Sequence, residues 1–102
     1  MVTMDELYTQ FDGVFFEKTR LSIVTLLNQD EKLAFTALKG RLGLSDGALY
    51  THLEKLIRGN YVQKERVLTP GGAETRYRLT SYGHETFRGY VDFLGRLLET
   101  DR

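Results

Sequence analysis

The chain has 102 residues, 41% of them hydrophobic, and its 14 basic and 14 acidic side chains balance to a formal net charge of zero. This length suits one domain, spanning 1–102, and is too short for two. The lack of cysteine excludes disulfides, thiolate metal sites and thiol redox switches, and the charge balance excludes a uniformly basic surface.

The sequence carries no pattern typical of membrane insertion or export. No apolar run approaches the roughly twenty residues that cross a bilayer. The first residues, MVTMDEL, are acidic and lack the basic-then-apolar order of a signal peptide. We therefore expect a cytoplasmic protein that has no membrane partner.

Two apolar segments open the chain, at residues 5–16 and 17–29. Residues 5–16, DELYTQFDGVFF, carry more large apolar side chains than the start of one small domain needs, so we predict that Phe11 and Phe15 contribute to a subunit interface. The alternative is that this segment folds entirely onto the chain's own core. Residues 17–29, EKTRLSIVTLLNQ, are apolar on most sides and predict a core helix, in which a structural ion pair is favoured for Arg20 over a DNA contact.

Short elements follow a polar turn. Residues 32–35 are expected to form a short strand. Thr36 is expected to cap a short helix whose inner side carries Leu38 and Leu42, and Gly43 opens the tight turn into the next helix. The pattern predicts a helix-turn-helix.

Residues 44–59, LSDGALYTHLEKLIRG, form the second helix of this motif. Ser45 offers its hydroxyl to the free amides of the helix start, leucines return at spacings of four and three, and Gly59 is expected to end the helix in the left-handed conformation. The outer face puts small or hydrogen-bonding side chains before charged ones, which suits a helix entering a DNA major groove by its N-terminal end. Any amphipathic surface helix also has a polar outer face. The outward residues are Gly47, Tyr50, Thr51, Glu54 and Arg58, flanked by Ala48 and Lys55.

Two strands come next, at 61–67 and 74–80, joined across residues 68–73. A hairpin directly after a helix-turn-helix is a wing. The second strand alternates cleanly with Arg76 and Arg78 outward. The apolar residues of the first strand are out of phase, which predicts a bulge or an early end.

Residues 81–99 predict a last helix, about nineteen residues long, that is capped by Thr80. Its apolar side chains cover an arc wider than one helix–helix contact needs, and a subset follows the alternating spacing of a coiled-coil stripe. We infer an isologous two-fold dimer built on this helix. The stripe consists of Phe87, Val91, Leu94 and Leu98.

One family is suggested by three segments taken together: KTRLSIVTLL (18–27), FTALKGRLGLSDGALYTHLEKLIRGNYV (35–62) and TRYRLTSYG (75–83). They resemble the small winged-helix transcriptional regulators of the MarR and ArsR type. The resemblance implies a mainly α fold with a small β-wing, in which a winged helix-turn-helix domain is followed by a long C-terminal dimerisation helix, about 81–99. It also implies a dimer whose recognition helix, about 46–58, reads the DNA major groove while the wing, about 61–79, touches the backbone or the minor groove.

The resemblance also assigns residues. Gly47, Ala48, Tyr50 and Thr51 fall on positions that meet bases or phosphates in the family. The surrounding segment, 39–78, holds eight basic and four acidic residues, so positive charge gathers in the part expected to bind DNA. The metal-sensing ArsR branch often binds metal through cysteines, which this chain lacks, so we expect no metal and no cofactor.

Further DNA contacts are expected beside the recognition helix. Helix dipoles favour phosphate near Thr36 and Ser45. Arg66 and Arg76 are expected to flank the wing on its DNA side, and Thr69 to reach phosphate from the tip, which lacks a basic cluster. The full predicted set is Thr36, Lys39, Ser45, Gly47, Ala48, Tyr50, Thr51, Lys55, Arg66, Thr69 and Arg76.

No combination of residues predicts an enzyme. The chain lacks a glycine-rich phosphate loop, metal-ligand spacing and a nucleophile with a base nearby. His52 borders the buried stripe of the recognition helix, so a structural histidine is favoured over a DNA contact, and over a metal ligand because His84 belongs to a different helix.

We therefore predict a sequence-specific regulator of transcription that binds double-stranded DNA as a homodimer. Successive major grooves on one face lie about 34 Å apart, so the expected operator is a short inverted repeat. The alternative is a winged helix used for protein assembly without DNA binding, which zero net charge favours. The sequence leaves a small-molecule effector open.

Overall fold

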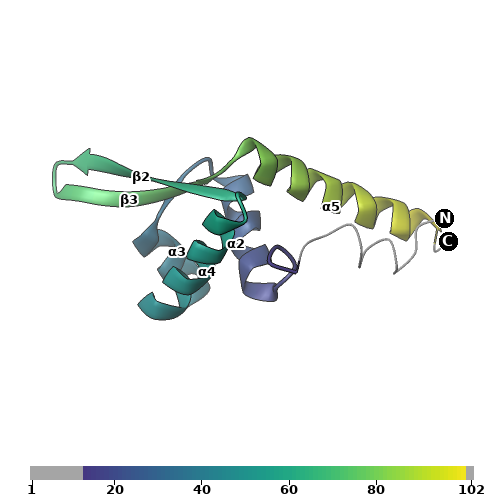
Figure 1. Ribbon diagram of the computed structural model, residues 1–102, viewed down its shortest axis with the longest axis horizontal. Coiled ribbons are helices and arrows are strands. Elements are labelled where there is room, and N and C mark those ends of the chain that lie inside the picture. The colour runs from purple at the N-terminus through teal and green to yellow at the C-terminus, as the bar shows by residue number, and fades with distance from the viewer. Residues whose placement is uncertain (1–12, 101–102) are drawn as a thin grey trace.

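The computed structural model describes residues 13–100. A block of three helices carries a hairpin on one side, and a long helix leaves the root of the hairpin in the opposite direction (Figure 1). The mainly α fold with a small β-wing is confirmed. In chain order the elements are α2 Lys18–Gln29, β1 Leu33–Ala34, α3 Phe35–Leu42, α4 Asp46–Arg58, β2 Val62–Thr69, β3 Gly72–Leu79 and α5 Ser81–Thr100.

The core lies where α2 meets α4 and the root of the hairpin. Ile23, Val24 and Leu27 of α2 have no solvent exposure, which confirms that this segment is a core helix. The leucine stripe of α4 is also fully buried, and its spacing of four and three residues is that of one helix face. That stripe consists of Leu49, Leu53 and Leu56.

The predicted cap of α3 is wrong. The helix starts at Phe35, Ala34 occupies the cap position without a side-chain hydrogen bond, and Thr36 lies exposed inside the first turn. The reason is that β1 runs directly into α3: Ala34 pairs with Arg76 of β3, so no residue separates strand from helix. Gly43, with a φ of 65°, ends α3 and makes the predicted turn.

The left-handed residue after α4 is Asn60 and not Gly59 as predicted. Asn60 has a φ of 67°, whereas Gly59 has a φ of −77°. The amide of Asn60 donates to the carbonyl of Ile57 at 3.0 Å, and the amide of Tyr61 donates to the carbonyl of Leu56 at 2.9 Å. This pair of hydrogen bonds is that of a Schellman motif. Gly59 is needed for space, because a Cβ there would lie 2.8 Å from the Tyr61 ring.

The wing is longer and more regular than predicted. β2 and β3 pair one to one from Val62 opposite Leu79 to Thr69 opposite Gly72, without a bulge, and only Pro70 and Gly71 connect them. The apolar phase fails in the outer half because that half extends beyond the core and buries no face: Leu68 is 88% exposed. β1 pairs with β3, so the strand order is β1-β3-β2 and the predicted third strand is confirmed.

Helix α5 begins with the predicted cap, in which the Thr80 hydroxyl accepts a hydrogen bond from the Gly83 amide at 2.9 Å. Along α5, Phe93 is fully buried, whereas Val91 and Leu98 are 48% and 68% exposed. The helix thus packs on its own chain by one side and leaves part of the predicted stripe uncovered. No helix in residues 13–100 is apolar over a stretch long enough to span a membrane.

Phe15 does not belong to an exposed interface. Its side chain has no solvent exposure and lies against Phe16, Tyr61 and Tyr90, with ring centroids 5.4 to 6.2 Å apart. The alternative stated for this segment therefore holds for Phe15, which folds onto its own chain. Phe11, predicted beside it, lies outside the described residues.

Candidate nucleic-acid interface

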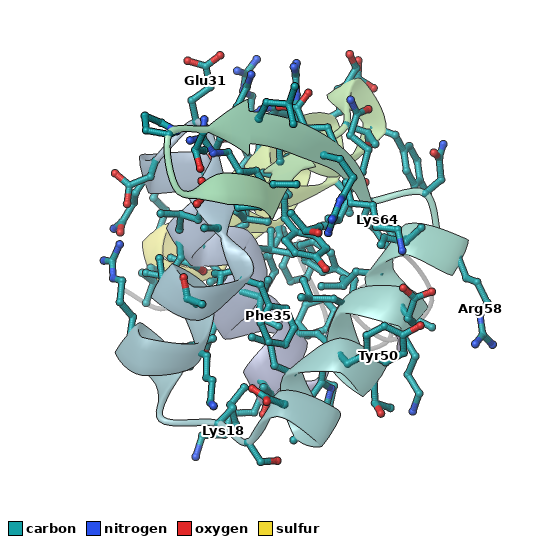
Figure 2. All side chains as sticks on the ribbon, turned by 90° about the vertical axis from the view of Figure 1, so that its left-hand side faces the viewer. Lys18, Glu31, Phe35, Tyr50, Arg58 and Lys64 are labelled. Atoms are coloured by element: carbon teal, nitrogen blue, oxygen red, sulfur yellow. The ribbon has the colours of Figure 1, made fainter. Side chains whose placement is uncertain are left out.

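The outer face of α4 is open along its first turns. Tyr50 is 55% exposed, Thr51 and Gly47 are exposed, and a Cβ built on Gly47 would meet nothing within 4 Å. Ser45 caps the helix as predicted, accepting from the Ala48 amide at 3.2 Å. The Thr51 hydroxyl donates to the Gly47 carbonyl at 2.9 Å, which leaves its oxygen able to accept. More than half of the Tyr50 side chain is thus open to solvent on the outer side of α4 (Figure 2).

Charges on the helix-turn-helix are arranged around the start of α4. Lys39 of α3 lies 2.8 Å from the Asp46 carboxylate, across the turn between the helices. The ion pair offsets the negative charge of Asp46 at the N-terminal end of α4, where the helix dipole otherwise favours the binding of an anion. Lys55 and Arg58 are exposed farther along α4, and Arg58 points away from the body (Figure 2).

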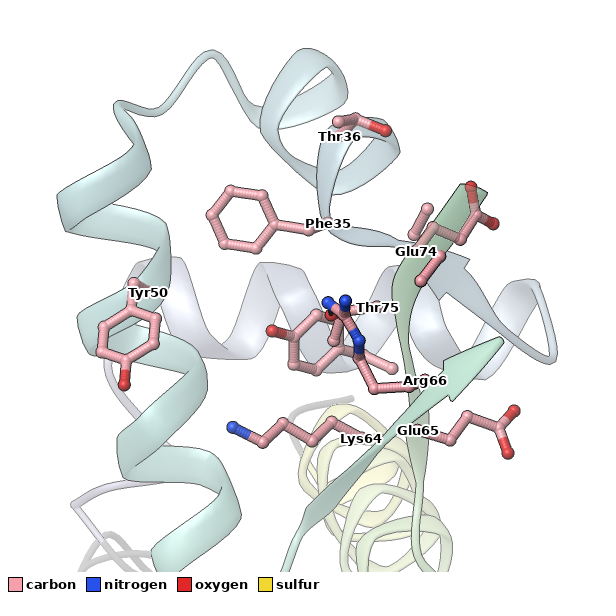
Figure 3. A pocket seen from close by; sticks show the side chains of 11 residues that line it. Phe35, Thr36, Tyr50, Lys64, Glu65, Arg66, Glu74 and Thr75 are labelled. Carbon is pink, nitrogen blue, oxygen red and sulfur yellow. Dashed lines mark hydrogen bonds between the residues drawn. The ribbon is translucent and has the colours of Figure 1, made fainter. Parts of the chain in front are cut away.

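A hollow of about 740 Å³ lies between α3, α4 and the wing. Phe35 of α3, Tyr50 of α4 and Lys64 and Arg66 of β2 line it together with Tyr77 of β3. Figure 3 shows the first four of these side chains turned toward the same space. The hollow joins the outer face of α4 to one face of the wing, so the two surfaces are continuous.

Lys64, absent from the predicted contacts, fixes the wing to α4. Its ammonium lies 3.3 Å from the Glu54 carboxylate. The hydrogen bond and the charge of Glu54 raise the pKa of Lys64, which therefore stays cationic. The signal in the sequence was the two-residue spacing between Lys64 and Arg66, which places both on one face of a strand. The out-of-phase apolar residues of that strand concealed it.

Arg66 and Arg76 do not share a face of the wing, contrary to the prediction. Arg66 stands opposite Thr75 and Glu65 opposite Arg76. Directly paired residues share a face, and neighbours along a strand alternate. Arg66 therefore lies on the face of the hollow, where it donates to the Thr75 hydroxyl at 3.0 Å. Arg76 lies on the reverse face.

The reverse face of the wing has its own ion pairs. Arg76 is half-buried and its Nε lies 2.5 Å from the Glu74 carboxylate. Lys32 lies 3.0 Å from Glu65, and its hydrogen bond and charge lower the pKa of that carboxyl. Arg76, Glu74 and Glu65 of this face are thus engaged within the chain.

Thr69 is also poorly placed for the predicted phosphate contact. Its hydroxyl donates to the Gly72 carbonyl at 2.7 Å and so closes the hairpin. The proton needed for a hydrogen bond to phosphate is therefore already engaged. The side chain that projects from the outer wing into solvent is Leu68.

Arg20 and His52 serve packing. Arg20 is 8% exposed, and its Nε donates to the Val14 carbonyl at 2.5 Å. Its Nη1 lies 3.0 Å from His52 Nδ1, so hydrogen bonds replace the predicted ion pair. His52 is half-buried, 3.8 Å from the Glu17 carboxylate, and is the structural histidine that was predicted. In residues 13–100 no three His, Cys, Asp or Glu side chains form a group able to hold a metal.

Comparison with known proteins gives the same fold. A family model described as a winged helix DNA-binding domain matches residues 19–98. An uncharacterised protein of Methanocaldococcus jannaschii is 32% identical over 78 residues, which cover 76% of this chain and 85% of that protein.

Solved structures agree. A transcriptional regulator homologue from Pyrococcus horikoshii superposes with a TM-score of 0.83 and 22% identity, over 95% of this chain and 94% of that one. A mutant MarR from E. coli, complexed with operator DNA, gives a TM-score of 0.69 and 20% identity over 84% of this chain and 61% of that one. At these identities the two likenesses establish the fold.

Proposed function

This chain belongs to the winged helix DNA-binding domain family, and from that premise we propose that it is a sequence-specific transcriptional regulator that binds double-stranded DNA as a homodimer. The observation that carries the proposal is the open outer face of α4, with Tyr50 and Thr51 exposed in its first turns. A helix whose exposed N-terminal half carries small and hydrogen-bonding side chains suits a major groove.

The proposed contacts follow from the chemistry of this face. Tyr50 can donate its hydroxyl proton to a base or phosphate, and Thr51 can accept from a base amino group or place its methyl against that of thymine. Gly47 lets the helix backbone approach closely, because a Cβ at this position would meet no atom of the described residues within 4 Å. Lys55 and Arg58 supply positive charge for the phosphates bordering the groove.

The wing extends the same surface. Lys64 and Arg66 face the hollow beside Tyr50, and their charges suit the DNA backbone next to the groove that holds α4 (Figure 3). The similar fold of MarR, which has been solved with operator DNA, supports this mode of docking.

A second copy of the chain is the proposed partner of α5. Val91 and Leu98 are large apolar side chains that stay 48% and 68% exposed in one subunit. They belong to the predicted stripe with Leu94, and a two-fold axis through it covers the same side chains on both subunits. Two recognition helices related in this way suit an inverted repeat with half-sites about 34 Å apart.

The test begins by selecting bound fragments from random-sequence duplexes. Tyr50→Ala and Thr51→Ala should then each reduce the preference for the selected site over random DNA by about tenfold. Binding to random DNA should change much less, since it depends on contacts to phosphate. The measurement is the ratio of the two dissociation constants at one salt concentration.

The matched control is Tyr82→Ala, which removes a tyrosine of similar exposure, 48%, from α5. Its ratio should equal that of the unchanged protein. Equal losses on selected and random DNA for the α4 variants would show that this face does not read sequence.

A further inference from the structure

Leu68 has the largest exposed fraction, 88%, among the exposed large hydrophobic side chains of residues 13–100. It stands opposite Ala73 near the end of the hairpin. Residues 67–73, VLTPGGA, contain no charged side chain. The outer wing therefore offers DNA an apolar surface in place of a cation.

The register fixes the face on which Leu68 lies. Lys64, Arg66 and Leu68 follow one another at two-residue spacing on β2, which pairs with β3 without interruption. All three share one face of the ribbon. That face is the one turned toward the hollow and α4, so Leu68 continues the surface proposed to meet DNA.

The spacing also fixes how far Leu68 reaches. Lys64 contacts Glu54 of α4 at 3.3 Å. Four residues farther along a strand is about 13 Å, at about 3.3 Å per residue, and the major groove is about 12 Å wide. With α4 in the groove, Arg66 lies near the bordering phosphates and Leu68 lies beyond them, over the adjacent minor groove.

We propose that Leu68 is a minor-groove contact that disfavours G·C pairs in the DNA flanking each half-site. The inference rests on the proposed function and adds a second specificity element to it. All base pairs present acceptors on the minor-groove floor, but only G·C adds the guanine amino group, a donor. A leucine side chain would cover that donor without accepting its hydrogen bond, which is unfavourable.

The shape of the minor groove also favours A·T over G·C pairs beside Leu68. The guanine amino group projects from the groove floor into the space that an apolar side chain would fill. A·T-rich minor grooves are narrower, which brings the sugars closer to such a side chain. Leu68 gains most from leaving water where these walls are close.

The experiment compares duplexes that carry the selected site and differ only in the flanking pairs, which are A·T, G·C or inosine·C. Inosine lacks the amino group in the minor groove but keeps the acceptors of guanine in the major groove. We expect G·C flanks to weaken binding about five- to tenfold relative to A·T. Inosine·C flanks should restore it to within about twofold.

Leu68→Ala should bind all three flanks within about twofold of one another. The matched control, Val67→Ala, shortens an apolar side chain on the reverse face and should keep the full discrimination. Salt provides a second readout. Leu68→Ala should leave the log-log slope of affinity against salt unchanged, because an apolar side chain displaces no counterions. Arg66→Ala should reduce its magnitude by about two, because each subunit of the dimer loses one phosphate contact.

Failure of this inference is distinguishable from failure of the proposed function. If the unchanged protein binds the selected site but treats G·C and inosine·C flanks alike, or if Leu68→Ala keeps the discrimination, Leu68 does not read the minor groove and DNA binding still stands. If no duplex is selected, DNA binding and the role of Leu68 are both overturned.

Discussion

Tyr61 shows how single residues set the angle between elements. Its ring is 2% exposed and lies between Phe15 and the stacked ring of Tyr82, with centroids 5.4 and 5.1 Å away. Its backbone approaches the start of α5 so closely that a Cβ on Gly83 would lie 2.1 Å from its carbonyl oxygen. Because they lack a Cβ, Gly59 and Gly83 make room for Tyr61 at the point where α4, the wing and α5 meet.

Gly59→Ala should therefore lower the free energy of unfolding by about 1–3 kcal/mol, because the enclosed Tyr61 ring cannot move away from the new methyl group. Asn60→Gly, one residue later, should change it by less than about 0.5 kcal/mol, since glycine accepts the same positive φ without strain. Urea denaturation of both variants measures the difference. A larger loss in Asn60→Gly would contradict this account of the helix end.

Helix α2 depends on an ionised side chain for its start. The Glu17 carboxylate accepts from the Thr19 amide at 2.6 Å. Burial raises the pKa of Glu17, but hydrogen bonds from Thr19 and Arg20, together with the nearby His52, outweigh burial and hold the pKa below its ordinary value. The folded state thus favours the charged form, as a helix N-terminus does.

Stability should consequently depend on Glu17 in acid. A carboxyl with a lowered pKa in the folded state stabilises the fold above its unfolded pKa, about 4.3. That contribution is lost as the pH falls through the lower folded value. Glu17→Gln should remove this part of the pH dependence, while Glu31→Gln, in the exposed turn after α2, should retain it. Urea midpoints between about pH 3 and pH 6 test the difference.

The elements differ in how well the sequence predicts them. Helical periodicity reports burial, and α2, α4 and α5 each bury a face, so their ranges were predicted closely. Strand faces were harder to predict, because the register depends on two strands. The alternation in β3 alone does not show that Arg76 pairs with Glu65 and therefore lies on the reverse face of the wing. The cap expected at Thr36 failed for a similar reason, since the pairing of β1 is not local.

Some features of the candidate site follow from the sequence, and others depend on contacts between elements. Exposure of Tyr50 and Thr51 follows from the leucine stripe of α4, which the sequence displays. The contact of Lys64 with Glu54 joins two elements ten positions apart and depends on how the wing leaves α4. Gly59 illustrates a further limit, because its role depends on the position of the Tyr61 ring and not on its own backbone angle.

The wing and α5 extend in opposite directions from the helical block (Figure 1). Burial of Phe15 removes that residue from the proposed interface, and Phe87 is half-buried against the core. The proposed dimer therefore depends on the outer part of α5, on Val91, Leu94 and Leu98. This arrangement leaves α4 and the wing of each subunit available to DNA.

Val91→Glu combined with Leu98→Glu should yield a monomer of 11.8 kDa in light scattering, because four carboxylates would meet at the two-fold interface. Both positions are exposed in one subunit, so the fold should be retained. Arg88→Glu, which places the same charge on an exposed position of the polar side of α5, should leave the dimer intact. An unchanged mass in the double variant would refute the interface.

We propose that this protein, which has no net charge overall, binds duplex DNA through a locally positive surface formed by α4 and the wing. The direct measurement is the affinity for mixed-sequence duplex as salt is raised. If about three cations of each subunit meet phosphate, the dimer should give a log-log slope of about −5. A slope near zero would contradict the claim and favour a winged helix that assembles with protein.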